Sequence, residues 1–345
     1  MGGAHAQVMS AAELSIGARV EQQTPADIRS ALAPSGLLVK TYGPRGTVHL
    51  LPRDELPLWC AALGAAPIGS SLPATARIDA NQTAAILDAI AGALSSGSSL
   101  DTEELDAAVI GQLGAWAGEQ VVPAFGGWWP RWRQAISLAA NRGILSFGEN
   151  RGSRVTFVSP GVTPEADSSR ALGWLLRLYL ATYGPATAAN FGRWLGVRPA
   201  WASAQFSRFA PDLEAVTVDG EPAFVNRGDV EQSETPSRGI TLLPHFDPYV
   251  IGSFPRDRLF PGAVAARAVA RGQAGVRPVL LVDGVVAGVW GLKRHANRLA
   301  VTVEAVTTLS KRQVGGTEVE VERLGRFLGM NAELTLGAIS TGAHK

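Results

Sequence analysis

Apolar and polar residues follow helical and then extended spacing within the first third of the chain. The clearest helix start is Thr24-Pro25-Ala26-Asp27, which predicts a helix to about residue 33. Thr24 can cap this helix, Pro25 suits its first turn and Asp27 favours its positive end. Two short apolar runs, 37–42 and 47–51, flank a Gly-Pro-Arg-Gly turn and predict a β-hairpin, after which another helix opens. A helix followed by a hairpin is typical of a winged-helix module.

Two further stretches repeat this order of short helices and a hairpin. The first predicts helices over 80–94 and from 101 onward, and residues 128–131 lead into a third helix that ends at 141. Strands over 144–148 and 154–158 are then predicted around a wing tip at 149–153. The second predicts helices over 169–183, 188–195 and 198–209, then a hairpin over 213–219 and 222–227. Helices followed by a hairpin in this order indicate two more winged helix-turn-helix modules.

The pattern changes after a linker at 232–237. Strand-like runs follow at 239–244, 279–282, 285–290 and 299–304, and a helix is predicted over 316–328. Asp283-Gly284 is a specific hairpin signal between two of these runs. We therefore predict an α+β protein with tandem winged-helix modules followed by a C-terminal β-barrel-like domain. The predicted domains are 1–65, 74–160, 168–230 and 237–345.

Composition narrows the class of protein. The 345 residues, 46% apolar and 18% charged, describe an ordered globular chain of several modules. A net charge of +1 excludes a histone-like polycation, so nucleic-acid binding would need a local basic patch. Cys60 is the single cysteine, which excludes an intrachain disulfide, and its apolar neighbours predict that it is buried. The histidines lack metal-ligand spacing, so we expect no metal and no other cofactor.

Basic residues gather at predicted turns and helix ends. Arg131 and Arg133 alternate with tryptophans, and Arg151 and Arg154 flank the predicted wing tip. The other candidate DNA-binding residues are Arg45, Arg198, Lys293, Arg294 and Arg298. Each of these is by itself more often a solvated cation, but several on one array of winged helices predict contacts with DNA phosphates.

The common hydrolytic and phosphate-binding motifs are absent from the sequence: there is no Gly-x-Ser-x-Gly elbow and no Walker loop. Asp247, which precedes a proline, is either an ordinary turn residue or a catalytic acid. His5 and Gln7 are two apart, so an extended segment would point both to one side, where they could hold a water molecule. A lone histidine near a terminus is more often solvated and without a function.

Several segments, taken in order, resemble the winged-helix DNA-binding-domain family that includes the AlkZ-like bacterial DNA glycosylases of the azinomycin-resistance type. They are residues 4–8, 39–50, 179–187, 242–249 and 282–290, so the resemblance covers nearly the whole chain. It implies tandem winged helices, a C-terminal β-barrel and a catalytic Gln-x-Gln motif with a His-x-Gln variant. Here that motif falls on His5 and Gln7.

Two features depart from the family pattern. His5 stands where glutamine is the commoner residue, which favours the branch linked to self-resistance against bulky DNA-alkylating natural products. Family members also usually carry a helical segment before the motif, where this chain has only four residues. We therefore expect the DNA upstream of Met1 to encode an amphipathic helix in frame; the alternative is that the chain is a shortened paralogue.

The resemblance predicts a monofunctional DNA glycosylase that hydrolyses the N-glycosidic bond of alkylated purines, in particular bulky or crosslinked N7-guanine adducts. His5 would act as the base and Gln7 would orient the water. No lysine lies near the motif, so a lyase step is not expected. The predicted partner is double-stranded DNA with alkylated bases, and the protein is expected to bind it as a monomer. We expect the protein to be cytoplasmic and nucleoid-associated, since neither a signal peptide nor a membrane-spanning run is found in the sequence. The alternative is a non-catalytic winged-helix protein that regulates transcription or shields adducts.

Overall fold

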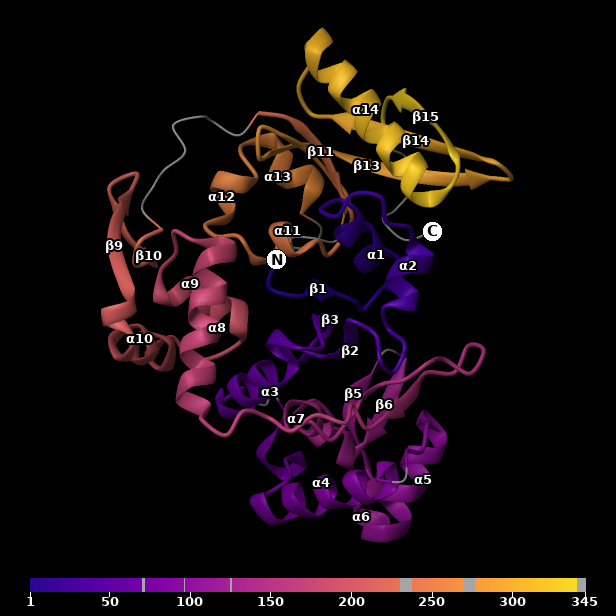
Figure 1. The fold of residues 1–345 in the computed structure, drawn as a ribbon, viewed down its shortest axis with the longest axis vertical. Helices are drawn as coiled ribbons and strands as arrows, with labels where there is room; N and C mark the ends of the chain where they lie inside the picture. Colours follow the sequence, from indigo (N-terminus) through magenta and orange to yellow (C-terminus); the bar gives the residue numbers. More distant parts are fainter. Residues whose placement is uncertain (70–71, 96, 125, 230–237, 270–276, 340–345) are drawn as a thin grey trace. The chain divides into compact units, whose positions relative to one another are not determined.

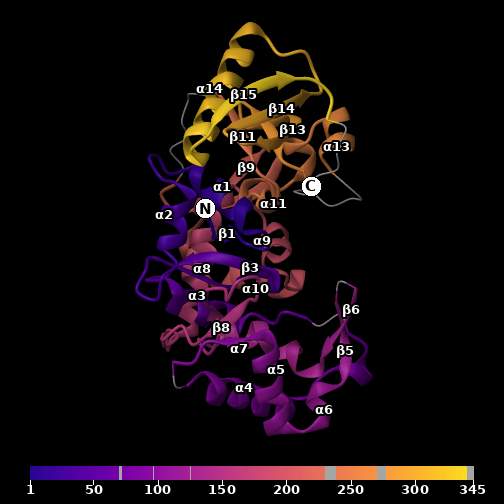
Figure 2. The ribbon, with the colours of Figure 1, turned by 90° about the vertical axis from the view of Figure 1, so that its right-hand side faces the viewer.

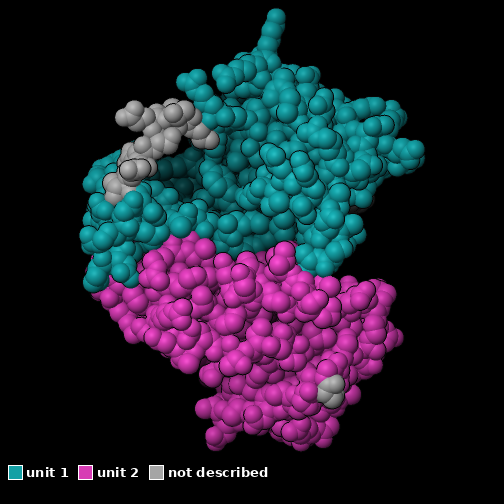
Figure 3. Space-filling model, in the orientation of Figure 1, with its two compact units in different colours: residues 1–31, 180–190, 211–345 teal, residues 32–179, 191–210 magenta. Residues whose placement is uncertain are grey.

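A computed structural model describes residues 1–69, 72–95, 97–124, 126–229, 238–269 and 277–339. The chain divides into two compact units, coloured separately in Figure 3. Unit 1 comprises residues 1–31, 180–190 and 211–345, and unit 2 comprises residues 32–179 and 191–210. The four predicted domains stay predictions, and the predicted linker at 232–237 lies outside the described residues.

Unit 1 begins with a short strand and two helices. They are β1 (Ala4–His5), α1 (Met9–Gly17) and α2 (Pro25–Ser30). Thr24 caps α2 as predicted, because its hydroxyl accepts a hydrogen bond from the Asp27 amide while the Asp27 side chain binds the Thr24 amide. The sequence pattern did not predict α1, whose mixed polar and small residues lack a clear apolar stripe.

A five-stranded sheet forms the centre of unit 1 (Figure 1). Its strands lie in the order β11 (Ile240–Leu243), β12 (Val279–Val282), β13 (Val285–His295), β14 (Arg298–Ala305) and β15 (Asn331–Leu336). All neighbours are antiparallel except β14 and β15, which are parallel. The predicted turn forms at Asp283-Gly284, where both residues have positive φ, which matches the twist of a tight hairpin.

Helices cover both faces of this sheet. The helix α14 (Lys311–Leu328) buries Val321 and Leu324 against Trp290 and the inward side chains of β14, and Figure 2 shows α14 beside β15 and β14. The other face packs against three short helices, α11 (Pro248–Gly252), α12 (Arg256–Leu259) and α13 (Ala263–Ala268). The resulting α+β domain, with one curled sheet and a crossing helix, confirms the predicted fold class at the C-terminus.

A second hairpin of unit 1 comprises β9 (Leu213–Val218) and β10 (Glu221–Asn226), with Asp219 and Gly220 at the turn. This confirms the predicted hairpin and its turn residues. Its strand β10 also makes an isolated antiparallel bridge, between Phe224 and Ala186.

Unit 2 begins with the predicted hairpin. It contains β2 (Leu38–Tyr42), the 3-10 turn η1 (Pro44–Gly46) and β3 (Val48–Pro52), followed by α3 (Leu56–Ala65). Cys60 is buried on α3 as predicted, and its sulfhydryl donates to the Ala140 carbonyl at 3.4 Å. Burial raises the pKa of this thiol to about 11, so Cys60 is a packing residue and not a nucleophile.

The next part of unit 2 has a core of its own. Its helices are η2 (Ala74–Ala76), α4 (Ala80–Leu94), α5 (Thr102–Leu113), α6 (Ala115–Gly118), η3 (Arg131–Ala135) and α7 (Ile136–Asn141). Its strands are β4 (Leu100–Asp101), β5 (Gln120–Ala124), β6 (Gly127–Pro130), β7 (Ser146–Phe147) and β8 (Thr156–Val158). Apolar residues of α4, α5 and α7 bury Trp132 together with Leu145 and Phe157.

The third set of helices is α8 (Ser168–Tyr183), α9 (Ala188–Leu195) and α10 (Pro199–Arg208), followed by η4 (Ala210–Asp212). Aromatic rings hold it together in unit 2, where Phe191 contacts Tyr179 on one side and Phe206 on the other. The predicted bounds of these helices agree with the structure within about two residues.

Several elements lie where the sequence pattern predicted something else. Trp128 and Trp129, which lead into the helix predicted to end at Asn141, lie on the strand β6, which pairs with β5 and was not predicted. The strand β15 follows the last predicted helix and was missed, because a parallel strand added after a helix gives no hairpin signal. None of the helices in the described part of the chain has the length and apolar character that a bilayer crossing requires.

An ion pair in unit 1 predicts a specific loss of stability in acid. Arg267 of α13 binds both carboxylate oxygens of Glu304 on β14, at 2.5 and 2.7 Å, and lowers the pKa of Glu304 from 4.5 to about 2. Because the folded pKa lies below the unfolded one, this stabilisation is complete above about pH 4.5 and is lost as the pH falls towards 2.

We expect Glu304→Gln to remove this part of the pH dependence, which amounts to at most about 1.4 kcal/mol per pH unit. Urea unfolding between pH 5 and 2.5 measures it. Glu333→Gln, in an exposed pair with Arg298, is the matched control and should leave the slope unchanged. Equal slopes for wild type and Glu304→Gln would contradict the prediction.

Candidate active site and DNA-binding surface

His5, the first residue of the predicted pair, lies at the end of β1 and is only 8% exposed. Its ring contacts the ring of Phe246, with centroids 5.1 Å apart and planes tilted by 42°. His245 contacts the same phenyl ring edge-on, also at 5.1 Å. The fold of unit 1 therefore brings His5 next to a loop some 240 residues later in the chain, which no local sequence pattern could indicate.

The loop that carries Phe246 is tightly held. Phe246 has a φ of +58°, a left-handed conformation that is rare for a bulky residue. The next residue, Asp247, is completely buried and both its oxygens accept hydrogen bonds from Arg19, each at 2.8 Å. Asp247 also accepts the Tyr249 amide and caps α11. Asp247 is therefore a turn and capping residue, and both of its oxygens accept hydrogen bonds within the fold. This agrees with the turn interpretation from the sequence and not with the catalytic acid.

Gln7, the second residue of the pair, is exposed and lies in a bend. The segment is extended only as far as His5, because β1 ends there and α1 begins at Met9. Gln7 directly precedes Val8, the N-cap of α1, which provides no capping side chain. The amide groups at this helix start favour negative charge, as would develop on an attacking water molecule.

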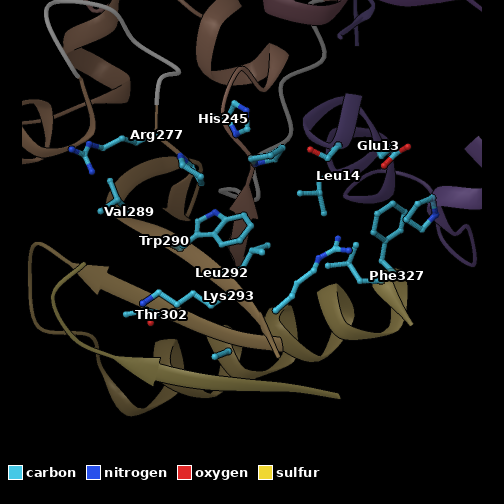
Figure 4. A pocket seen from close by; sticks show the side chains of 18 of the residues that line it. Glu13, Leu14, His245, Arg277, Val289, Trp290, Leu292, Lys293, Thr302 and Phe327 are labelled. Atoms are coloured by element: carbon cyan, nitrogen blue, oxygen red, sulfur yellow. The ribbon is translucent and has the colours of Figure 1, made fainter. Parts of the chain in front are cut away.

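A groove of about 970 Å³ opens in unit 1 beside this loop (Figure 4). The helices α1 and α2 form one wall, with Glu13, Leu14 and Arg29, and strands β13 and β14 with α14 form the other. His245 lines the groove, and Figure 4 shows Trp290 between His245 and Lys293. His245 therefore belongs both to the groove and to the aromatic cluster around His5.

The groove carries an excess of positive charge. Glu13 is the only carboxylate among its described lining residues, and Arg29 binds it at 2.6 Å. Arg277, Lys293 and Arg294 also line the groove, and Lys293 and Arg294 are exposed on β13. Three cations beyond the Arg29–Glu13 pair favour an anionic ligand such as a DNA phosphate. Arg298, at the start of β14, is in an exposed ion pair with Glu333 at 3.3 Å.

Four of the predicted basic residues of unit 2 lie in ion pairs with neighbouring acids. Arg131 binds Glu119 and the Ala76 carbonyl, and Arg133 binds Asp106 and lies over the Trp129 ring at 5.6 Å. The predicted wing is present, with Arg151 bonded to Glu104 and Arg154 to Asp101. The hydrogen bond from Arg151 is the main cause of the lowered pKa of Glu104. DNA binding by these four arginines stays a prediction.

Arg45 and Arg198 occupy helix and turn positions of unit 2. Arg45 has a φ of +60° in the 3-10 turn between β2 and β3, and it donates to the Trp194 carbonyl at 2.8 Å. Arg198 is exposed and is the N-cap residue of α10. Their predicted contacts with DNA stay predictions as well.

Comparison with known proteins decides the family. The family description "DNA glycosylase AlkZ-like" matches residues 1–327, nearly the whole chain. The chain belongs to the AlkZ-like DNA glycosylase family. A curated relative from Streptomyces sahachiroi, the interstrand DNA cross-link repair glycosylase, is 30% identical over 309 residues, covering 84% of this chain and 79% of the relative.

The solved structure of Streptomyces sahachiroi DNA glycosylase AlkZ has the same fold. It superimposes with a TM-score of 0.79 at 27% identity, covering 97% of this chain and 91% of that protein. The family resemblance and the fold class inferred from the sequence are thereby confirmed. As an AlkZ-like DNA glycosylase, this chain has DNA as its substrate.

Sequence reasoning missed the contribution of Arg19 and Phe246 to this AlkZ-like site. Arg19 gave no signal, because its partner Asp247 is 228 residues away. Phe246 gave a partial sequence signal, since an aromatic residue followed by Asp-Pro suggests a tight turn. Only the tertiary structure shows that this turn meets β1.

Proposed function

We propose that this AlkZ-like glycosylase hydrolyses the N-glycosidic bond of alkylated purines, with bulky or crosslinked N7-guanine adducts as its substrates. The observation that carries the proposal is that a member of a family of DNA glycosylases has a cationic groove in unit 1, whose lining residue His245 shares the Phe246 ring with His5. The relative named as an interstrand DNA cross-link repair glycosylase supports the crosslinked substrate class. Self-resistance to DNA-alkylating natural products is the proposed biological role.

The chemistry of such a substrate suits a site with few catalytic groups. Alkylation at N7 gives guanine a positive charge, so the base leaves readily and needs little help from a general acid. The enzyme then has to position a water molecule and stabilise positive charge on the sugar. His5 would accept the proton of the attacking water, and Gln7, beside the start of α1, would orient it.

The direct test is abasic-site formation. Purified protein is incubated with a duplex that carries one N7-alkylguanine and, separately, with a duplex crosslinked through N7 of two guanines. Strand breakage after alkali reports excision in the first, and separation of the strands reports unhooking in the second. Binding to both duplexes without abasic sites would overturn the proposal and favour a non-catalytic adduct-shielding protein.

We also propose that the protein acts as a monomer bound to the nucleoid. Light scattering of the free protein and of its DNA complex tests the first part, and a stoichiometry of two chains per duplex would contradict it. Co-sedimentation with chromosomal DNA from a lysate tests the second.

The groove of unit 1 predicts how binding depends on salt. Lys293→Ala and Arg294→Ala should each lower the slope of log K against log salt concentration by about one, because each phosphate contact releases about one counterion. Fluorescence anisotropy between 50 and 300 mM NaCl measures this. Lys311→Ala removes an exposed cation at the start of α14 and should leave the slope unchanged. Unchanged slopes for both hairpin variants would mean that this edge of β13 faces solvent in the complex.

A further inference from the structure

We propose that Phe246 is a positioning residue that holds the His5 ring in place and stabilises its protonated form while the glycosidic bond breaks. This inference rests on the proposed function, in which His5 takes a proton from water. It assigns a role to a residue outside the His-x-Gln motif, on a loop that connects β11 and α11.

The phenyl ring of Phe246 lies close to the imidazole of His5. Their centroids are 5.1 Å apart and their planes are tilted by 42°, so the phenyl ring lies within reach of the imidazole. A cation within about 6 Å of an aromatic ring is attracted by the electrons of its face. As the proposed base, His5 would start as the neutral imidazole and become a cation when it accepts the proton. The contact therefore strengthens along the reaction, which is what accelerates a chemical step.

The loop holds Phe246 in an uncommon backbone conformation. A positive φ at a phenylalanine is unfavourable, and such conformations persist where the surrounding structure holds them in place. Here the surrounding structure is the buried Asp247, which binds Arg19 through both oxygens and caps α11. Tyr249 adds a further restraint, because its hydroxyl donates to the Gly284 carbonyl at 2.7 Å. The loop is thus fixed directly after Phe246 in the conformation that places its ring against His5.

Few charged or titratable groups on this loop lie beside the Phe246 ring. Asp247 is the one carboxylate on the loop, and Arg19 neutralises it, so it is not a counter-ion for His5. The titratable neighbour of Phe246 on the groove side is His245, whose ring meets it edge-on at 68°. The phenyl ring thus lies in contact with both imidazoles, and it lies within the distance at which an aromatic ring attracts a cation at His5.

The experiment compares Phe246→Leu, Phe246→Met and Phe246→Tyr in single-turnover excision of N7-alkylguanine from a duplex. Leucine and methionine fill much of the volume without an aromatic face, and we expect each to slow excision about tenfold with unchanged affinity for DNA. Tyrosine keeps the face, and we expect it to restore the rate to within about threefold of wild type. Phe260→Leu, in the core of the same unit, is the matched control and should lower the melting temperature without slowing excision at 25 °C.

Two further measurements separate positioning from a general structural effect. In the His5→Ala background, Phe246→Leu should cause no additional loss, because the two residues act as a unit. The NMR signals of the His5 ring protons should shift in Phe246→Leu and return towards their wild-type positions in Phe246→Tyr, because the ring current of the phenyl group acts on them.

The outcomes distinguish this inference from the function on which it rests. If His5→Ala slows excision but Phe246→Leu and Phe246→Met keep the wild-type rate, the role of Phe246 is overturned and the proposed function stands. An additional loss in the double variant would also overturn it, because Phe246 would then act apart from His5. If His5→Ala itself excises at the wild-type rate, the catalytic role of His5 fails first.

Discussion

His5→Ala is expected to slow single-turnover excision of an N7-alkylguanine by at least about 100-fold, while its affinity for the same duplex stays unchanged. A positioned general base contributes typically about 100- to 10,000-fold. The positive charge on the alkylated base already activates the leaving group, so the lower part of this range applies. His5 is also 8% exposed and lies against Phe246, so bulk water does not replace the imidazole in the same geometry.

The measurement uses enzyme in excess over duplex, with alkali cleavage as the readout and anisotropy for binding. His295→Ala, at an exposed position at the end of β13, is the matched control and should retain the wild-type rate. Gln7→Ala should also slow excision without weakening binding, and by a smaller factor, because the role proposed for Gln7 is to orient the water and not to take its proton. The wild-type rate should fall as the solution is acidified, because a protonated imidazole cannot accept a proton.

A wild-type rate in both His5→Ala and Gln7→Ala would move the active site elsewhere. Asp247 is a poor alternative in this fold, because both of its oxygens are already bound by Arg19 and it has no exposed surface. The groove residue His245 would then be the first substitution to make.

Arg19→Ala is expected to lower the free energy of unfolding by about 3 kcal/mol. Removing one partner of a buried ion pair leaves the other charge unpaired, and such changes cost about 3–5 kcal/mol. Asp247 has no exposed side-chain surface, whereas Arg19 is 30% exposed, so entry of water next to Asp247 places the effect at the lower end. The same substitution releases the Phe246 loop, so excision should slow as well.

Urea unfolding measures this change, with Arg298→Ala as the control. Arg298 and Glu333 are more than half exposed, and pairs of this kind contribute about 0–1 kcal/mol. Adding Asp247→Asn to Arg19→Ala should recover part of the loss, because asparagine can still cap α11 but carries no charge. A loss below about 1 kcal/mol for Arg19→Ala, or no recovery in the double variant, would show that the pair does not hold the loop.

Local signals in the sequence were sufficient for most elements of this protein. The capping box at Thr24 and Asp27, the helix over 80–94 and the turn at Asp283-Gly284 all form as predicted. Each depends on residues within a few positions of one another, where backbone geometry and capping hydrogen bonds decide the structure. The motif segments likewise sufficed for the family, because their order along the chain is itself a sequence property.

Only the tertiary structure decided which side chains meet. Arg19 and Asp247, or His5 and Phe246, are separated by more than 220 residues, and neither pair has a local signal. Helix α1 and strand β15 were missed for a related reason, since both are stabilised by distant partners: Gly17 lies against Phe327, and β15 pairs with β14. Whether a cation is available to DNA is also a tertiary property, because Arg133 and Lys293 look alike in sequence but the fold pairs Arg133 with Asp106 and leaves Lys293 exposed at the groove.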